Sequence, residues 1–291
     1  MLISNFIKEI DDDAFLLYQK ISQGKMLRAK LVSKIAGDSE DSKKLSAVIE
    51  MIHTASLLHD DVIDESKTRR GVHSINALYG DKSAIMLGDI LYSKGFLELL
   101  YFDKEIAKFI SDAVCELSVG EMMDVNLSNE INLDKVKYFQ MIYKKTSVLI
   151  EATAKSAAYL AKKDVISYGL YGKNLGLAFQ VIDDVLDVTM SDEQLGKPSL
   201  ADFKEGKTTL PYIYLFESLN DQDAQRLKSL YKKELTEDEK NWIKQKMRES
   251  GAILRAVEFA QKLGKEALKA IEVDKNDDLQ RVITDMIERD F

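Results

Sequence analysis

Along most of the chain, apolar residues recur at the three- and four-residue spacing that places them on one face of an α-helix. Two such series are Leu45, Val48, Ile49, Ile52, Ser56 and Val148, Ile150, Ala152, Ala154. No segment shows the apolar–polar alternation of a half-buried strand. The two prolines are Pro198 and Pro211, so residues 1–197 contain no obligatory helix breaker. We therefore expect one all-α domain over residues 1–291.

Charge and composition narrow the class of protein. The 291 residues include 41 basic and 49 acidic side chains, a net charge of −8, which argues against a nucleic-acid binder. The single cysteine, Cys115, excludes an intramolecular disulfide and fits a reducing compartment. No apolar run approaches the roughly 18 residues that span a bilayer, and the acidic start of the chain lacks the order of a secretion signal. We expect a cytoplasmic protein.

Two acidic clusters of the same pattern interrupt apolar segments. They are Asp60-Asp61-Val62-Ile63-Asp64 and Asp183-Asp184-Val185-Leu186-Asp187. On a helix, residues i and i+4 share a face, so each cluster presents paired carboxylates. Carboxylates in largely apolar surroundings repel one another and lose hydration unless a cation compensates them. A solvated patch is the alternative for one cluster, but two matching copies favour a shared polyvalent cation site.

The ligand type indicates which ion such a site prefers. Carboxylates are hard oxygen donors that suit magnesium, calcium or manganese. Zinc is disfavoured because the three histidines and one cysteine show no zinc-like spacing. Calcium buffering is disfavoured because the sequence contains no glycine-bearing acidic loop of the EF-hand type. Magnesium takes one or two carboxylates and completes its shell with water and substrate phosphates, so the clusters predict a phosphorylated substrate.

Several basic residues near the clusters are candidates for binding phosphate. Guanidinium forks clamp phosphate oxygens, and Arg69 and Arg70 follow the first cluster just before Gly71. Lys25 and Arg28 lie three residues apart, as on one helix face. His53 precedes Asp60 by seven residues and so lies on nearly the same helix face. For each lysine and arginine the alternative is an ordinary solvated side chain, and for His53 it is a buried structural histidine.

Together these residues resemble the trans-polyprenyl diphosphate synthases, which elongate isoprenyl chains head to tail. The resemblance runs from Gly24 to Pro211. It is carried by residues 52–64 with Arg69-Arg70-Gly71, and by residues 179–187 with Gly196-Lys197-Pro198 and Glu205-Gly206-Lys207. It implies a single helical bundle around a deep central cavity, paired as a homodimer. It also implies two or three Mg²⁺ ions per site, with isopentenyl diphosphate and an allylic diphosphate, farnesyl or geranyl, as substrates.

The resemblance assigns roles by position. Asp60, Asp64 and Asp183 are implied as direct magnesium ligands, and Asp61, Asp184 and Asp187 as their support. The allylic diphosphate is implied to be held by Arg69, Lys145, Thr146, Gln180, Lys197 and Lys207. Isopentenyl diphosphate is implied to be held by Lys25, Arg28, His53 and Arg70. Lys145 and Lys197 join the six aspartates as catalytic residues because they would act on the leaving diphosphate.

The chain departs from the family pattern in places. Gln23 and Ala29 replace the outer members of the first basic motif, whose charged residues are kept. Asp124 stands where the family commonly has glutamine, and its role does not follow from the sequence. Leu200 stands where glycine is common and is expected to stiffen the following loop.

Product length is expected to depend on side chains one to two turns before Asp60. Ala55 and Ser56 are small there, where short-chain family members carry an aromatic. We therefore expect a long, octaprenyl-like product for a quinone side chain, free to partition into a membrane. The cavity that holds the growing isoprenyl chain is expected to be closed at its far end by residues among Phe96, Tyr101, Phe102, Met122 and Met123. The alternative is that these five residues belong to the ordinary hydrophobic core.

Three alternatives stay open. The first is a geranylgeranyl or farnesyl diphosphate synthase, which differs only in product length. The second is a class I terpene cyclase, which usually lacks a second complete acidic motif and the set of Lys25, Arg28 and His53. The third is a non-catalytic subunit of a heteromeric synthase, which typically loses acidic residues that this chain keeps. The exact chain length, preferred primer, dimer surface and pathway do not follow from the sequence.

Overall fold

The computed structural model describes residues 2–22, 24–191, 199–274 and 276–287. The chain divides into two compact units. Unit 1 comprises Met1–Cys115 and Leu149–Gly169, and unit 2 comprises Glu116–Val148 and Leu170–Phe291. The single domain expected from the sequence stays a prediction.

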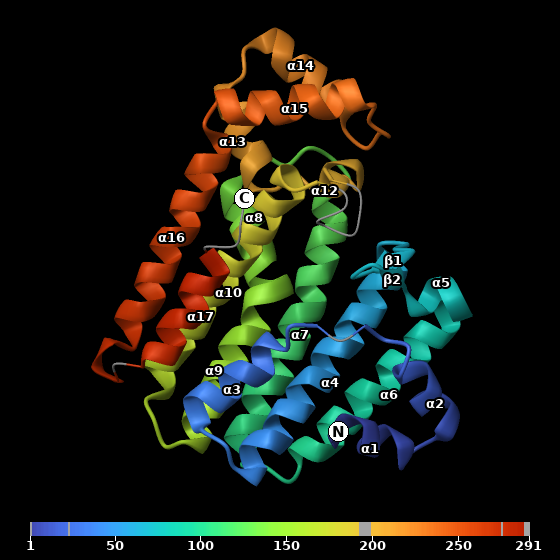
Figure 1. Ribbon diagram of the computed structural model, residues 1–291, viewed down its shortest axis with the longest axis vertical. Coiled ribbons are helices and arrows are strands. Elements are labelled where there is room, and N and C mark those ends of the chain that lie inside the picture. Colours follow the sequence, from blue (N-terminus) through green and yellow to red (C-terminus); the bar gives the residue numbers. More distant parts are fainter. Residues whose placement is uncertain (1, 23, 192–198, 275, 288–291) are drawn as a thin grey trace. The chain divides into compact units, whose positions relative to one another are not determined.

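Unit 1 is built around two long helices. Its elements are α1 (Leu2–Lys8), α2 (Asp12–Tyr18), α3 (Leu27–Ala36), α4 (Glu40–Ile63), β1 (Thr68–Arg69), β2 (Val72–His73), α5 (Ile75–Tyr79), α6 (Asp81–Leu99), the first half of α7 (Lys104–Leu127), most of α9 (Val148–Leu160) and the start of α10 (Val165–Thr189). Helix α4 packs along α6, with α3 against α4 (Figure 1). These contacts give the unit its core.

The packing of α4 on α6 depends on two glycines seven residues apart. A Cβ added at Gly95 would lie 3.1 Å from Ile52 Cγ1, and one at Gly88 would overlap the His59 ring. Residues seven apart lie on nearly the same helix face. The predicted apolar series from Leu45 to Ser56 is buried in this contact region of α4.

Unit 2 contains the remaining helices. They are the second half of α7, α8 (Lys135–Ile142), the π-helical turn η1 (Tyr143–Ser147), the rest of α10, α12 (Ala201–Lys204), α13 (Leu210–Ser218), α14 (Asp221–Leu230), α15 (Glu237–Glu249), α16 (Ala252–Ala270), η2 (Glu272–Asp274) and α17 (Asp277–Ile287). Helix α16 packs on α13, α15 and α17 (Figure 1). The all-α prediction is confirmed for the described residues.

The expectation that no strand occurs is wrong at one place. Strands β1 and β2 pair antiparallel, Thr68 with His73 and Arg69 with Val72. Arg70 and Gly71 form the two-residue turn, and both have positive φ, 54° and 76°. Such a turn matches the twist of a hairpin. Strands of two residues are too short to show an alternating pattern, so they could not be predicted from apolar–polar spacing.

In the described part of the chain, none of the helices combines the length and apolar character needed to cross a membrane.

Candidate active site

The first aspartate trio lies at the C-terminal end of α4. Asp60 and Asp64 are one turn apart, and the Asp64 N–H donates to the Asp60 carbonyl oxygen over 2.8 Å. The helix ends at Ile63, so Asp64 caps it. Asp60 and Asp64 are half-buried and Asp61 is buried. A helix C-terminus carries partial negative charge, which adds to the mutual repulsion of three carboxylates gathered there. A cation at this position would offset that repulsion.

Asp61 is the member of this trio that binds an arginine. Its Oδ1 lies 2.7 Å from Arg69 Nη2 and accepts a hydrogen bond from Arg69 Nε over 2.8 Å. Burial disfavours the guanidinium charge, but the hydrogen bond and the charge of Asp61 outweigh it, so the pKa of Arg69 is raised. The carbonyl oxygen of Asp61 accepts from Asn76 Nδ2 over 2.9 Å. Asp61 thereby holds Arg69 beside the trio.

A second cluster in unit 1 brings together basic residues predicted to hold isopentenyl diphosphate. The pKa of Arg28 is lowered to about 10, mainly by burial and also by the nearby charge of Arg70, although the charge of Glu50 opposes the shift. The Nε of Arg28 is buried and has no hydrogen-bond partner among the described residues. Burial, then the charges of Arg28, Arg70 and Arg69, hold the pKa of His53 well below its usual value. This crowding of positive charge favours a bound anion.

Arg70 is tied to the chain that precedes α3. Its Nη1 donates to the Ser22 carbonyl oxygen over 2.8 Å. Its guanidinium occupies the space that a Cβ on Gly24 would need, with Nη2 2.6 Å from that position. Gly24 therefore permits this close approach. Lys25, the remaining member of the predicted set, is exposed.

Glu50 belongs to this cluster, although sequence reasoning missed it. It is buried in the middle of α4, and its Oε1 accepts from the Ala29 N–H over 3.0 Å. Ala29 is in the first turn of α3, where backbone N–H groups have no partner within the helix. A glutamate among buried apolar neighbours on α4 was the available signal, because a buried charge requires a partner.

The second aspartate trio lies on α10 in unit 2. Gln180 Nε2 donates to Asp184 Oδ1 over 2.9 Å, and the Tyr138 hydroxyl donates to Asp184 Oδ2 over 2.5 Å. Thr146 Oγ1 donates to Gln180 Oε1 over 2.7 Å. Burial, then the charge of Asp202, raises the pKa of Asp184 against these hydrogen bonds. Since both of its oxygens accept hydrogen bonds, Asp184 fits the supporting role, and Asp183 beside it is half-buried.

Asp187, the last member of this trio, links α10 to the start of α12 through two hydrogen bonds. Its carbonyl oxygen accepts from the Leu200 N–H over 2.9 Å, and its Oδ2 accepts from the Asp202 N–H over 3.3 Å. The Tyr212 hydroxyl is buried with no hydrogen-bond partner among the described residues. Burial, then the charges of Asp187 and Asp202, raises the pKa of Tyr212 well above its usual value. Asp202 is a further carboxylate near the trio that sequence reasoning missed.

Lys145 and Thr146 lie in the π-helical turn η1, between α8 and α9. Single π-turns inside helices occur often at functional sites. Two glycines make room for this one. A Cβ on Gly120 would lie 2.7 Å from Lys145 Cα, and one on Gly176 would lie 2.6 Å from Ser147 Cα. The π-turn could not be predicted from helical spacing, since its hydrogen-bond register depends on these tertiary contacts.

The Lys145 ammonium is paired with two buried carboxylates on α7. Its Nζ lies 2.6 Å from Asp124 Oδ2 and 2.9 Å from Glu121 Oε2. Lys144, the preceding residue, forms an ion pair with Glu116, which also lies on α7. Helix α7 therefore presents three carboxylates to two lysines of the π-turn.

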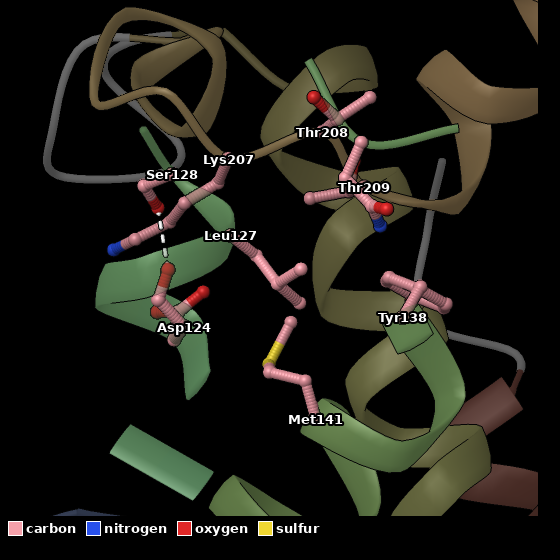
Figure 2. Close-up of a pocket in the computed structure, with 9 residues that line it drawn as sticks. Asp124, Leu127, Ser128, Tyr138, Met141, Lys207, Thr208 and Thr209 are labelled. Carbon is pink, nitrogen blue, oxygen red and sulfur yellow. Dashed lines mark hydrogen bonds between the residues drawn. The ribbon is translucent and has the colours of Figure 1, made fainter. Parts of the chain in front are cut away.

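Asp124 also lines a small cavity within unit 2, shown in Figure 2. Its volume of about 20 Å³ suits roughly one water molecule. Lys207, Thr208 and Thr209 line it from the segment that precedes α13, and Tyr138 lines it from α8. Lys207 Nζ donates to Glu205 Oε2 over 2.7 Å. Lys197, predicted to act with Lys207, lies outside the described residues.

The residues expected to govern product length are buried. Ala55 and Ser56 are almost inaccessible on α4, and Ser56 Oγ donates to the His53 carbonyl oxygen over 2.8 Å. Among the residues considered for the end of the path, Tyr101 is 79% exposed and Met122 66% exposed. For these two, ordinary core is wrong.

The structure therefore gathers the predicted residues into separate groups. Unit 1 holds the first trio and the cluster of Arg28, His53 and Arg70. Unit 2 holds the second trio with Lys145, Thr146, Gln180 and Lys207. The convergence of the two trios stays a prediction.

The donor set fits magnesium. Among the described residues, no three His, Cys, Asp or Glu side chains come together as a ready-made metal centre. Magnesium requires fewer protein ligands, since water and substrate phosphates complete its octahedron. Asp60, Asp64 and Asp183, each half-buried at a helix surface, provide hard oxygen donors of that kind.

Comparison with known proteins shows where these features recur. A profile of the family described as polyprenyl synthetase matches residues 14–247. The solved octaprenyl pyrophosphate synthase from Helicobacter pylori is 44% identical, with a TM-score of 0.94, covering 99% of this chain and 96% of that one.

Two curated relatives carry names that differ in product length. A short chain isoprenyl diphosphate synthase from Methanothermobacter thermautotrophicus is 35% identical over 219 residues, 71% of this chain and 67% of the relative. Solanesyl diphosphate synthase 2, chloroplastic, from Arabidopsis thaliana is 34% identical over 282 residues, 91% of this chain and 66% of the relative. The chain thus spans about two thirds of the length of these relatives.

Proposed function

Because the chain belongs to the polyprenyl synthetase family, we propose that it elongates an allylic diphosphate by successive head-to-tail condensation with isopentenyl diphosphate. The product is a long-chain all-trans polyprenyl diphosphate of octaprenyl type. One observation carries the proposal: the family match over residues 14–247 includes both complete aspartate trios and the basic residues expected for two diphosphate substrates.

The proposed site divides its residues by substrate. Asp60, Asp64 and Asp183 hold two or three Mg²⁺ ions, with Asp61, Asp184 and Asp187 as support. The allylic diphosphate is held by Arg69, Lys145, Thr146, Gln180, Lys197 and Lys207. Isopentenyl diphosphate is held by Lys25, Arg28, His53 and Arg70. The buried Nε of Arg28, which has no hydrogen-bond partner among the described residues, supports this last assignment.

The reaction needs stabilisation of a leaving group more than it needs a nucleophile. Magnesium, when bound, offsets charge on the departing diphosphate and lowers the barrier to breaking the allylic C–O bond. Lys145 and Arg69 donate to the oxygens on which negative charge accumulates. The double bond of isopentenyl diphosphate attacks the allylic cation, and loss of a proton to the released pyrophosphate restores an alkene. Apolar faces such as that of α4 exclude water, which would quench the cation to an alcohol.

Product analysis tests the proposal. The purified chain is incubated with farnesyl diphosphate, labelled isopentenyl diphosphate and Mg²⁺, and dephosphorylated products are separated by chromatography. Long polyprenols are expected. Turnover without isopentenyl diphosphate would indicate a terpene cyclase, and activity only after another protein is added would indicate a subunit of a heteromeric synthase. Products no longer than geranylgeraniol would indicate a short-chain synthase.

Two variants test the metal ligands. Asp60→Ala and Asp183→Ala should each lower kcat by at least about 10²-fold, the loss typical of removing one electrostatic stabiliser. Helix content by circular dichroism should stay unchanged, because both side chains are only half-buried at their helix surfaces. Wild-type turnover in either variant would contradict the assignment.

The product-length assignment has its own test. Ala55→Tyr places an aromatic ring one to two turns before Asp60 and should shorten the product by one or more isoprene units, since each unit spans on the order of one helical turn. Chromatography of the dephosphorylated products measures this. An unchanged product length would contradict the proposed path.

A homodimer is part of the proposal. Apolar side chains are exposed along one face of α7, where Val119 and Met122 follow Cys115 at helical spacing. Helix α6 exposes Met86 and Leu97, and the exposed Leu100 follows directly after it. Contiguous exposed apolar faces commonly mark protein interfaces.

A further inference from the structure

Asp124 is the departure from the family pattern for which the structure suggests a role. Two carboxylates, Glu121 and Asp124, contact the single ammonium of Lys145 at 2.9 and 2.6 Å. Both carboxylates are buried, with 7% and 4% of their surface exposed. The group of three therefore carries a net charge of −1, whereas glutamine at position 124 would leave it neutral.

The backbone position of Lys145 does not depend on these two carboxylates. Its backbone lies in η1, packed against Gly120 of α7, one residue before Glu121. The two carboxylates then fix the far end of the side chain from the same helix. A lysine ammonium has three donors, so pairing with two carboxylates does not by itself prevent a bond to a phosphate oxygen.

Asp124 is close to more than one of the lysines assigned to the allylic diphosphate. Besides contacting Lys145, it lines the small cavity of unit 2 that Lys207 also lines (Figure 2). A carboxylate in this place repels an incoming diphosphate, and the repulsion is poorly screened because the group is buried.

We infer that Asp124 is a positioning residue that, with Glu121, orients the Lys145 ammonium and weakens the hold of the site on diphosphate. The inference rests on the proposed function, in which Lys145 binds the allylic diphosphate. Its consequence is that the enzyme releases pyrophosphate more readily than it would with a neutral residue at position 124.

Neutral replacements at position 124 test the inference. Asp124→Asn keeps the size and an acceptor oxygen, and Asp124→Gln introduces the residue common in the family. Both variants should fold, because the hydrogen bonds to residue 124 from Ser128 N and Oγ go to its backbone carbonyl oxygen. The matched control is Asp112→Asn, which removes one charge from an exposed position on the same helix.

The measurement is the affinity for inorganic pyrophosphate in the presence of Mg²⁺, determined by isothermal titration calorimetry. Both Asp124 variants should bind on the order of tenfold more tightly than the wild type, which corresponds to about 1.4 kcal/mol. The control should stay within about twofold. In steady-state assays the variants should show a lower KM for the allylic diphosphate and stronger inhibition by pyrophosphate, with no rise in kcat.

Two failures are distinguishable. If the wild type does not condense isopentenyl diphosphate at all, the proposed function fails. If the wild type elongates and binds pyrophosphate while the folded Asp124 variants bind it equally or more weakly, only the role of Asp124 is overturned. A purely structural role would lower the urea midpoint of the variants without tightening pyrophosphate binding.

Discussion

His53 shows how the surroundings of one residue set its charge. Burial and three neighbouring arginines lower its pKa well below the ordinary value of 6.5. The imidazole is therefore neutral in the folded protein at pH 7. A neutral imidazole can still donate one hydrogen bond, which suits contact with a diphosphate oxygen without further crowding of positive charge.

This shift predicts a pH dependence of stability. The folded-state pKa is lower than the unfolded one, so below pH 6.5 the unfolded chain binds a proton that the folded chain does not. The contribution of His53 to stability is present above pH 6.5 and is lost as the pH falls, by at most about 1.4 kcal/mol per pH unit. Urea unfolding at pH 8 and pH 5.5 should therefore show a larger acid loss for the wild type than for His53→Gln. Equal losses would contradict the shift.

Leu200 is a residue whose backbone and side chain have opposing requirements. Its φ is +61°, a left-handed conformation, while its side chain is 1% exposed. The left-handed region costs a non-glycine residue about 1–2 kcal/mol, so the buried leucine must offset that cost. The stiffening expected from the sequence has a physical basis in this conformation.

A pair of substitutions separates the two requirements. Leu200→Ala should lower the free energy of unfolding by about 2–5 kcal/mol, through loss of buried apolar volume. Leu200→Gly loses the same side chain but relieves the positive φ, so it should be more stable than the alanine variant by about 1 kcal/mol. Thermal unfolding compares them, and an alanine variant as stable as the glycine variant would contradict the account.

At the scale of elements, glycine contacts determine where helices touch. Gly120 and Gly176 make room for the π-turn that carries Lys145 and Thr146, and Gly88 and Gly95 do so for the packing of α6 on α4. The neighbours differ in kind. Gly120 faces backbone atoms, which cannot move aside, whereas Gly95 faces the side chain of Ile52.

That difference predicts unequal costs for the same substitution. Gly120→Ala should lower the free energy of unfolding by about 1–3 kcal/mol, as overpacking does, and should raise the KM for the allylic diphosphate by displacing Lys145. Gly95→Ala is the control and should cost less, because Ile52 can shift by a few tenths of an ångström. Urea unfolding and steady-state kinetics check both. Equal effects on KM would show that the π-turn does not position Lys145.

At the scale of the whole molecule, exposed apolar side chains support self-association. Met122, 66% exposed, lies on the α7 face proposed for the dimer, whereas Leu254, 61% exposed on α16, lies outside that face. Light scattering after size exclusion should give twice the chain mass of 33.0 kDa. Met122→Glu should shift the protein toward monomer, because a charge would be buried in the interface. The matched variant Leu254→Glu should stay dimeric, and a monomeric wild type would refute the proposal.

The sequence predicted best what depends on local spacing. The helical periodicity of α4, the shared helix of Asp183, Asp184 and Asp187, and the all-α class follow from residues close in the chain. The hairpin at Arg70, the π-turn at Lys145 and the pairing of Glu50 with Ala29 were missed. Each arises between segments far apart in the chain or within elements too short to show a period.

The amino-acid sequence by itself determined the helical class, the two carboxylate trios and the basic residues, because side-chain chemistry and helical spacing are properties of the chain. Only the tertiary structure decided which of these groups are already engaged. It pairs Asp61 with Arg69, Asp184 with Tyr138, and Lys145 with Asp124 and Glu121. Hydrogen bonds and ion pairs act over about 3 Å, so these partnerships depend on packing that brings distant residues together.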